Sequence, residues 1–167
     1  MRRTLLILTV AAVVTGQAGA AITSSNYQAL RVKSEKRIDH ALDVARFFEN
    51  HPKSAKSVIG KQVIRTQKAV LKWNQGRLDR VQRFVYAGDF LPPIWKHIAI
   101  CEPGKNPINW KHDSGTYQGA FGFHYESWDD FNRFGYPSEA YLATPEQQYR
   151  VALAIHDKYG FTGWGCA

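Results

Sequence analysis

Apolar residues recur at helical intervals through the first half of the chain. Ile38, Ala41, Ala45 and Phe48 lie three or four residues apart, which places their side chains on one face of an α-helix. Asn50-His51-Pro52 ends this pattern, because proline breaks a continuing helix. The pattern therefore predicts a long amphipathic helix that ends near residue 50.

A second helical pattern starts near Ser54. Apolar residues repeat every seven positions along it, with others between them: Ile64, Leu71, Leu78, Val81, Phe84 and Val85. This spacing is typical of a helix that packs along another helix. The two stripes predict either an antiparallel helical hairpin or a surface on which the second half of the chain docks.

The pattern changes after a predicted linker at residues 88–93. Residues 95–101 form a short apolar stretch, which predicts a helix that ends at Pro103-Gly104. Residues 108–123 contain the turn sequence Asp113-Ser114-Gly115 between aromatic-rich pieces that we expect to be extended. Residues 127–134 are expected to form a short helix.

The last predicted helix has a strong start. Thr144 is a suitable N-cap, Pro145 occupies the first turn and Gln147 stands at the capping-box position. We expect the helix to run to about Tyr159 and to stop at Gly160. The order of elements predicts a mainly α fold (α+β) with a small β element, preceded by a two-helix segment.

The N-terminus has the pattern of an export signal. Arg2 and Arg3 precede an apolar run from Leu5 to Val14, and Ala18-Gly19-Ala20 suits signal peptidase. The run is shorter than the ~20 residues that span a bilayer, although an uncleaved anchor is the alternative. We therefore expect a signal at residues 1–20, a helical segment at 21–92 and a domain at 93–167, with no stable membrane anchor after cleavage.

Charge separates the two halves. Residues 21–92 carry 14 Lys and Arg against 6 Asp and Glu, a net charge of +8, whereas residues 93–167 carry 6 against 8, a net charge of −2. The basic face of the first half could hold anionic wall polymers, or it could simply be solvated. Nucleic acid is a poor partner, because no nucleic-acid motif accompanies the charge and the aromatic residues gather in the acidic half.

Cys101 and Cys166 are the two cysteines of the chain. In an exported protein such a pair is most simply a disulfide. A metal site is the alternative, since His97 and Cys101 would share one helix face, but four ligands at structural-zinc spacing cannot be assembled. We expect no metal and no cofactor, and a bridge that brings the C-terminus beside Glu102.

Glu102 follows Cys101 at the end of a predicted helix. The helix dipole disfavours a negative charge there, and aromatic neighbours and a disulfide would limit hydration. A carboxyl that is kept protonated can act as a general acid on a glycosidic oxygen. An ordinary surface glutamate is the alternative.

Four aromatic residues stand among glycines and polar residues: Trp110, Tyr117, Tyr125 and Trp128. These surroundings favour a solvent-facing groove, in which flat aromatic rings suit the faces of sugars.

Several of these features match a known family together. Cys101-Glu102, Trp110 and the stretches YQGAFGFHYESW (117–128), YPSEAYLATPEQQYRVA (136–152) and GFTGWGC (160–166) resemble the catalytic domain of the resuscitation-promoting factors. These are secreted bacterial peptidoglycan hydrolases with a compact lysozyme-like fold. The resemblance runs from about residue 93 to the C-terminus and does not cover residues 21–92.

The resemblance implies roles for individual residues. Glu102 would be the catalytic acid, and Cys101 and Cys166 would form the family's disulfide. The implied substrate-binding positions are Trp110, Tyr117, Gly119, Phe123 and Trp128. Peptidoglycan glycan strands would be the substrate.

The sequence also departs from the family. Pro103 and Lys105 stand where small residues usually follow the Cys-Glu pair. The family's Gly-Gly-Leu-Gln-Phe reads Gly-Ala-Phe-Gly-Phe here, so Gly122 replaces a glutamine that would contact the substrate. We expect this change to alter substrate affinity or preference, and a non-catalytic glycan-binding module is the alternative function.

Two mechanisms remain open. A lysozyme-type hydrolase needs a second carboxylate, ~5 Å away or further. Asp113 is a candidate, although it is also a good turn former, and three more acids lie nearby: Glu126, Asp129 and Asp130. A lytic transglycosylase needs only one carboxylate, which acts first as acid and then as base. We favour the single-carboxylate route for cleavage of the MurNAc–GlcNAc linkage, in a protein secreted to the cell wall.

Overall fold

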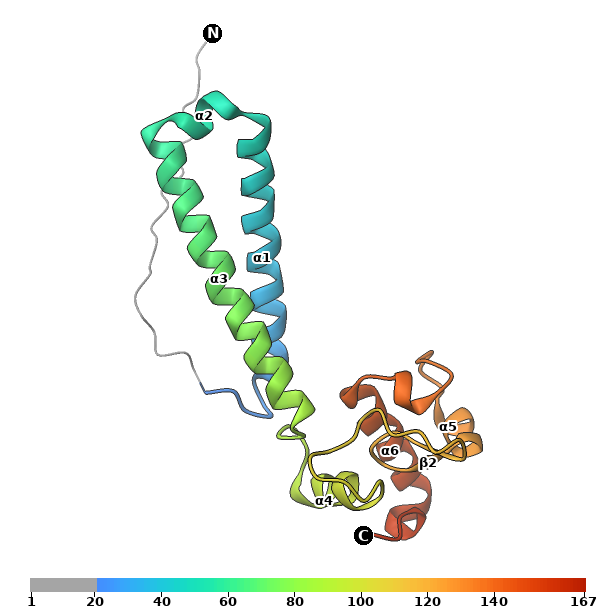
Figure 1. Ribbon diagram of the computed structural model, residues 1–167. Coiled ribbons are helices and arrows are strands. Elements are labelled where there is room, and N and C mark those ends of the chain that lie inside the picture. Colours follow the sequence, from blue (N-terminus) through green and yellow to red (C-terminus); the bar gives the residue numbers. More distant parts are fainter. Residues whose placement is uncertain (1–20) are drawn as a thin grey trace. The chain divides into compact units, whose positions relative to one another are not determined.

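The computed structural model of the chain describes residues 21–167 (Figure 1). The predicted export signal at residues 1–20 lies outside the described residues. Helices dominate the described chain, and β1 (Tyr117–Gln118) and β2 (Phe123–His124) form a two-stranded antiparallel sheet. The predicted mainly α fold with a small β element is confirmed. Within the described part, residues 32–76 form one compact unit, and residues 22–31 with 77–167 form another.

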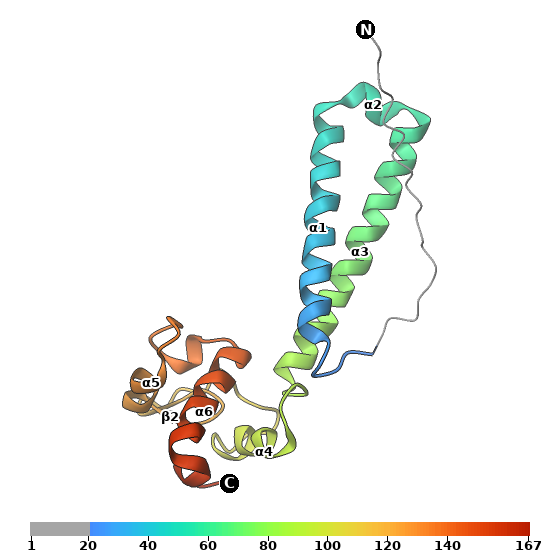
Figure 2. The same cartoon turned by 180° about the vertical axis from the view of Figure 1, so that it is seen from behind.

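Two long helices and a short one make up the helical hairpin. α1 (Tyr27–Asn50) and α3 (Val58–Tyr86) run side by side, and α2 (Pro52–Lys56) joins them at one end (Figures 1 and 2). The sequence predicted one helix from about Ser54, but the chain is extended at Ser57, with ψ 159°. This break separates α2 from α3.

Small and polar residues occupy the buried positions of the unit at 32–76. Ser34, Ala41, Gly60 and Asn74 are buried, whereas the larger side chains of the predicted stripes, such as Ile38 and Leu71, are half-buried. In a layer of two helices each apolar stripe is covered on one side only, so its larger side chains stay partly exposed.

The second unit has a large hydrophobic core that includes residues from the start of α1 and from the end of α3. Tyr27 from the start of α1 and Val85 from the end of α3 are buried with Phe90 and Leu91. The ring centroids of Tyr27 and Phe90 lie 5.8 Å apart. Residues 88–93, interpreted as a linker from the sequence, therefore include two core side chains.

α4 (Pro93–Cys101) and α6 (Pro145–Tyr159) carry most of the remaining core. Trp95 of α4 is 5% exposed, and its ring packs edge-on against Phe121, Tyr149 and Trp164. These three residues come from separate parts of the sequence, so Trp95 joins α4 to the β-hairpin region, to α6 and to the C-terminal tail.

α5 (Tyr125–Phe131) begins and ends earlier than the predicted helix at 127–134. It starts directly after β2. It stops because the Asn132 side chain donates hydrogen bonds to the carbonyl oxygens of Tyr136 (3.2 Å) and Pro137 (3.0 Å), which draws the chain out of the helix. A short 3₁₀ helix, η1 (Ala140–Leu142), leads from there to α6.

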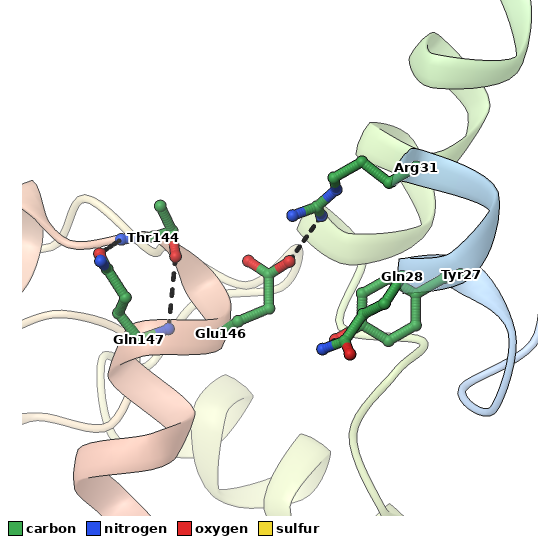
Figure 3. A network of polar contacts seen from close by, with 6 residues as sticks. All are labelled: Tyr27, Gln28, Arg31, Thr144, Glu146 and Gln147. Atoms are coloured by element: carbon green, nitrogen blue, oxygen red, sulfur yellow. Dashed lines mark hydrogen bonds and ion pairs between the residues drawn. The ribbon is translucent and has the colours of Figure 1, made fainter. Parts of the chain in front are cut away.

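The start of α6 has the predicted capping box. The Gln147 N–H donates to Thr144 Oγ1 at 3.3 Å, and the Thr144 N–H donates to Gln147 Oε1 at 2.9 Å (Figure 3). Glu146 in the same turn accepts a 2.6 Å hydrogen bond from Arg31 of α1 (Figure 3). α6 ends at Gly160, also as predicted, and η2 (Gly160–Gly163) leads into the tail.

Residues 21–167 include no helix with the length and apolar character that a membrane span needs.

Candidate active site

Glu102 stands at the C-terminal end of α4. Its N–H still donates to the carbonyl oxygen of Ile98 (2.9 Å), so its backbone continues the helix. Gly104 then adopts a φ of +63°, which lets the N–H of Lys105 donate back to the carbonyl oxygen of Ile100 at 3.1 Å. The helix ends where the sequence predicted, and Glu102 is left half-buried in its last turn.

The predicted disulfide between Cys101 and Cys166 is confirmed. The two Cα atoms lie 6.0 Å apart, and the C-terminus lies beside α4 in both views of the ribbon (Figures 1 and 2). The Cys166 N–H donates to Glu102 Oε1 at 3.2 Å. The disulfide therefore brings a hydrogen-bond donor to the candidate catalytic carboxylate.

The same tail also holds the opposite side of the site. Trp164 Nε1 donates to the carbonyl oxygen of Phe121 at 3.0 Å, and Phe121 directly precedes Gly122. A Cβ atom added at Gly122 would lie 3.3 Å from Glu102 Cβ and 3.4 Å from Glu102 Oε2. The backbone of Gly122 thus faces the Glu102 carboxylate, and the tail positions both.

A buried glutamine of α6 fixes the turn at residues 119–122. Gln148 Oε1 accepts the Ala120 N–H at 2.9 Å, while Gln148 Nε2 donates to the carbonyl oxygen of Trp110 at 2.9 Å. An added Cβ at Gly119 would lie 2.6 Å from Gln148 Oε1, so this close approach requires glycine. Gln148 is fully buried, and its Nε2 also donates to the carbonyl oxygen of Ala143 at 3.2 Å.

The sequence interpretation missed Gln148, although a signal for it existed. Gln147 was recognised as a helix cap, but Gln148 lies on the apolar stripe of α6 with Val151, Ala152 and Ile155. A polar residue on the core face of a helix must find hydrogen-bond partners there. That pattern marks Gln148 as a residue with a positioning role.

The five predicted substrate-binding residues lie around this turn, but they differ in exposure. Tyr117 is 52% exposed, whereas Trp110 (3%), Phe123 (3%) and Trp128 (0%) are buried. The three buried aromatic residues support the turn from the core, and Gly119 is part of the turn itself. The indole N–H groups of Trp110 and Trp128 donate to the backbone carbonyls of Tyr86 and Pro137. Tyr117 is the member of the set whose ring a ligand can reach.

Another aromatic side chain is accessible next to Tyr117. Tyr117 pairs with His124 across the two strands, and the rings of His124 and Tyr125 stack at 4.6 Å. Tyr125 is 48% exposed. Tyr117 of β1 and Tyr125 at the start of α5 are thus two exposed tyrosines in this region.

Asp113, the candidate second carboxylate, has a local role. Its Oδ1 accepts the Gly115 N–H at 2.9 Å, which closes the turn that the sequence predicted. Glu126 is highly exposed and accepts a 3.4 Å hydrogen bond from the Tyr125 hydroxyl. Residues 21–167 contain no group of three or more His, Cys, Asp and Glu side chains arranged to hold a metal ion.

Comparison with known families fits this geometry. Residues 92–167 match the family model of the transglycosylase-like domain. Residues 92–167 are therefore similar to transglycosylase-like domains. Neither the curated proteins nor the solved structures give a match to the chain. The family points to glycosidase chemistry on peptidoglycan and to action at the cell wall, and a disulfide fits a compartment outside the cytosol.

Proposed function

We propose that the transglycosylase-like domain cleaves the MurNAc–GlcNAc linkage of peptidoglycan, with Glu102 as general acid and base. The observation that carries this proposal is the placement of Glu102. Its half-buried carboxylate is held by the Cys166 N–H on one oxygen and faces the Gly122 backbone with the other. A fixed carboxyl group that is partly shielded from water suits proton transfer to a glycosidic oxygen.

This arrangement supports the single-carboxylate route. Glu102 donates its proton to the glycosidic oxygen as the bond from that oxygen to the anomeric carbon breaks. A hydroxyl of the same sugar then attacks the anomeric carbon, and the Glu102 carboxylate accepts the proton of that hydroxyl. Asp113 is engaged in its own turn, which favours this route over a lysozyme-type hydrolysis with Asp113 as second carboxylate.

Substrate binding is assigned to the exposed side of the β-hairpin. Tyr117 offers a flat, accessible ring on which a sugar can stack. The buried side chains of Trp110, Phe123 and Trp128 hold the β-hairpin in place from the core side. Gly122 has no side chain at the position where the resuscitation-promoting factors carry a glutamine, so we expect weaker or altered recognition of the substrate's amide groups.

We also propose that the protein is secreted and acts as a relative of the resuscitation-promoting factors. The Arg-rich start, the small residues before Ala21 and the disulfide support export. The basic hairpin would bind anionic wall polymers by charge. Retention of the mature chain on cell walls should then fall steeply with salt, because the Debye length shrinks to about 3 Å at 1 M.

Product analysis tests the enzymatic proposal. Purified protein is incubated with peptidoglycan, and the soluble muropeptides are separated and weighed by mass spectrometry. We expect products with anhydro ends, whereas reducing ends would assign a lysozyme-type hydrolase. Binding without soluble product, in a reaction where a control lysozyme works, would instead favour the glycan-binding module that Gly122 makes plausible.

A further inference from the structure

Two apolar side chains are largely exposed to solvent at the end of the helical hairpin where α2 leads into α3. Val58 is 85% exposed and Ile59 is 77% exposed, the highest values among the large hydrophobic residues of the described chain. The two are adjacent in sequence and open α3. We call residues 52–61, which comprise α2 and the first turn of α3, the hairpin tip.

The hairpin tip is a closely packed turn. The Ser57 hydroxyl donates to the carbonyl oxygen of Ser54 at 2.7 Å and accepts the Gly60 N–H at 2.9 Å. A Cβ atom added at Gly60 would lie 2.0 Å from the Ser54 carbonyl oxygen, so this contact requires glycine. The turn therefore fixes α2 against the start of α3 and presents Val58 and Ile59 outward.

Positive charge surrounds this apolar pair. Lys53 and Lys56 lie in α2, Lys61 follows in the first turn of α3, and all three are exposed. Between Glu49 and Asp79 the chain carries seven Lys and Arg and no Asp or Glu. The hairpin tip thus combines exposed aliphatic side chains with uncompensated cations.

We propose that the hairpin tip docks reversibly on an anionic lipid bilayer. Such a surface offers both features that the tip complements: anionic headgroups for the lysines and an apolar boundary for Val58 and Ile59. A hydrated anionic polymer would bind the lysines but would gain nothing from the aliphatic pair. Docking would hold a cell-wall-acting protein close to the membrane without a spanning segment.

Vesicle flotation tests this proposal with the mature chain, residues 21–167. The probes are neutral phosphatidylcholine vesicles and vesicles that also contain phosphatidylglycerol. We expect binding to the anionic vesicles only. The double variant Val58→Ser/Ile59→Ser should weaken it at least ~10-fold, because each aliphatic side chain loses its apolar contact. Lys53→Gln/Lys56→Gln/Lys61→Gln should weaken binding about 100-fold, because each lysine near an anionic surface contributes about 1 kcal/mol, which is about 5-fold in affinity.

Matched controls come from the same hairpin. Val32→Ser/Leu42→Ser removes two other exposed aliphatic residues, and Lys68→Gln/Lys72→Gln removes two exposed lysines outside the tip. The aliphatic control should leave binding unchanged, and the lysine control should lower it less per charge than the tip variant. Circular dichroism verifies that all variants keep their helices. Absence of flotation with anionic vesicles, or equal losses in the tip and control variants, would overturn the proposal. A loss with the lysine variant but not with Val58→Ser/Ile59→Ser would also overturn it, because binding would then depend on charge alone.

Discussion

At the scale of single residues, Gly122 distinguishes this site from the family that it resembles. Its φ of +59° lies in the left-handed region, and its Cα is close enough to Glu102 that a Cβ would meet the carboxylate side chain. Both the backbone conformation and the contact therefore favour glycine. The glutamine of the family cannot be restored here without a shift of Glu102 or of the turn.

Replacing Gly122 with alanine should lower activity more than stability. We expect kcat/KM to fall ~10-fold or more, because small displacements of a catalytic group are costly. The backbone strain should cost about 1–2 kcal/mol of unfolding free energy. Gly135→Ala is the matched control, since Gly135 also has a positive φ (+69°) but has open space around it. Equal activity of the two variants would show that the contact with Glu102 is unimportant.

Local motifs predicted much of the site at this scale. The two cysteines predicted the disulfide that the structure contains, and the Asp-Ser-Gly sequence predicted the turn that Asp113 closes. The catalytic role of Glu102 stays a prediction. Burial was harder to predict, because Trp110 and Trp128 stand among glycines and polar residues in sequence but are covered by segments distant in the chain. Exposure of an aromatic residue depends on those distant segments.

At the scale of elements, the C-terminal tail connects α4 with the β-hairpin region. The disulfide closes a loop between residues 65 positions apart, which the chain-entropy model values at about 4 kcal/mol. The tail also donates the Cys166 N–H to Glu102 and the Trp164 indole N–H to Phe121. Stability and the geometry of the site are therefore coupled.

Reduction of the disulfide should lower activity before the helices melt. Loss of the bridge frees the tail, so Glu102 loses its hydrogen-bond donor while the core around Trp95 remains. Activity and helical circular dichroism are measured together during titration with reductant at constant temperature. Loss of both signals in one step would contradict this separation, and two alkylatable thiols in freshly purified protein would refute the bridge itself.

Tyr27 of α1 and Tyr149 of α6 make the stability of the fold depend on pH. Burial raises the pKa of Tyr27 and of Tyr149 above 10.0, the ordinary value of the phenol. The folded protein then keeps protons that the unfolded chain releases, so the stabilisation is complete below pH 10 and is lost as pH rises through the folded pKa values.

Urea unfolding at neutral pH and above pH 10 measures this effect. We expect the unfolding free energy of the wild type to fall at the higher pH, and that of Tyr27→Phe to fall less, because phenylalanine has no proton to lose. An equal fall in both proteins would show that Tyr27 does not contribute to the pH dependence.

At the scale of the whole molecule, the region that matches the family model and the compact unit that contains it cover different residues. The match covers residues 92–167, whereas the compact unit also includes residues 22–31 and 77–91. The sequence could not show this division. The stripe of α3 looks uniform from Ile64 to Val85, but only its end packs in the large core, and periodicity does not tell which partner a stripe meets.

A fragment of residues 92–167 should therefore be far less stable than the mature chain. It lacks Tyr27, Val81 and Val85, each worth about 1.5–3 kcal/mol when buried, against a typical total of 5–15 kcal/mol. It also leaves the Trp110 indole without the Tyr86 carbonyl. Thermal unfolding of both proteins measures the difference, and a cooperative transition of the fragment at the Tm of the mature chain would contradict the assignment of these segments to the core.

The proposed catalysis depends on Glu102, and the measurement that tests this role most directly is muropeptide release by wild type and Glu102→Gln. The amide keeps the size and the hydrogen bond of the carboxyl but cannot deliver a proton, so product release should fall roughly 100-fold or more while glycan binding persists. Asp157→Asn, which changes an exposed acid of α6 in the same way, should release wild-type amounts. Release by Glu102→Gln close to that of wild type would contradict the assignment of Glu102 as the catalytic acid.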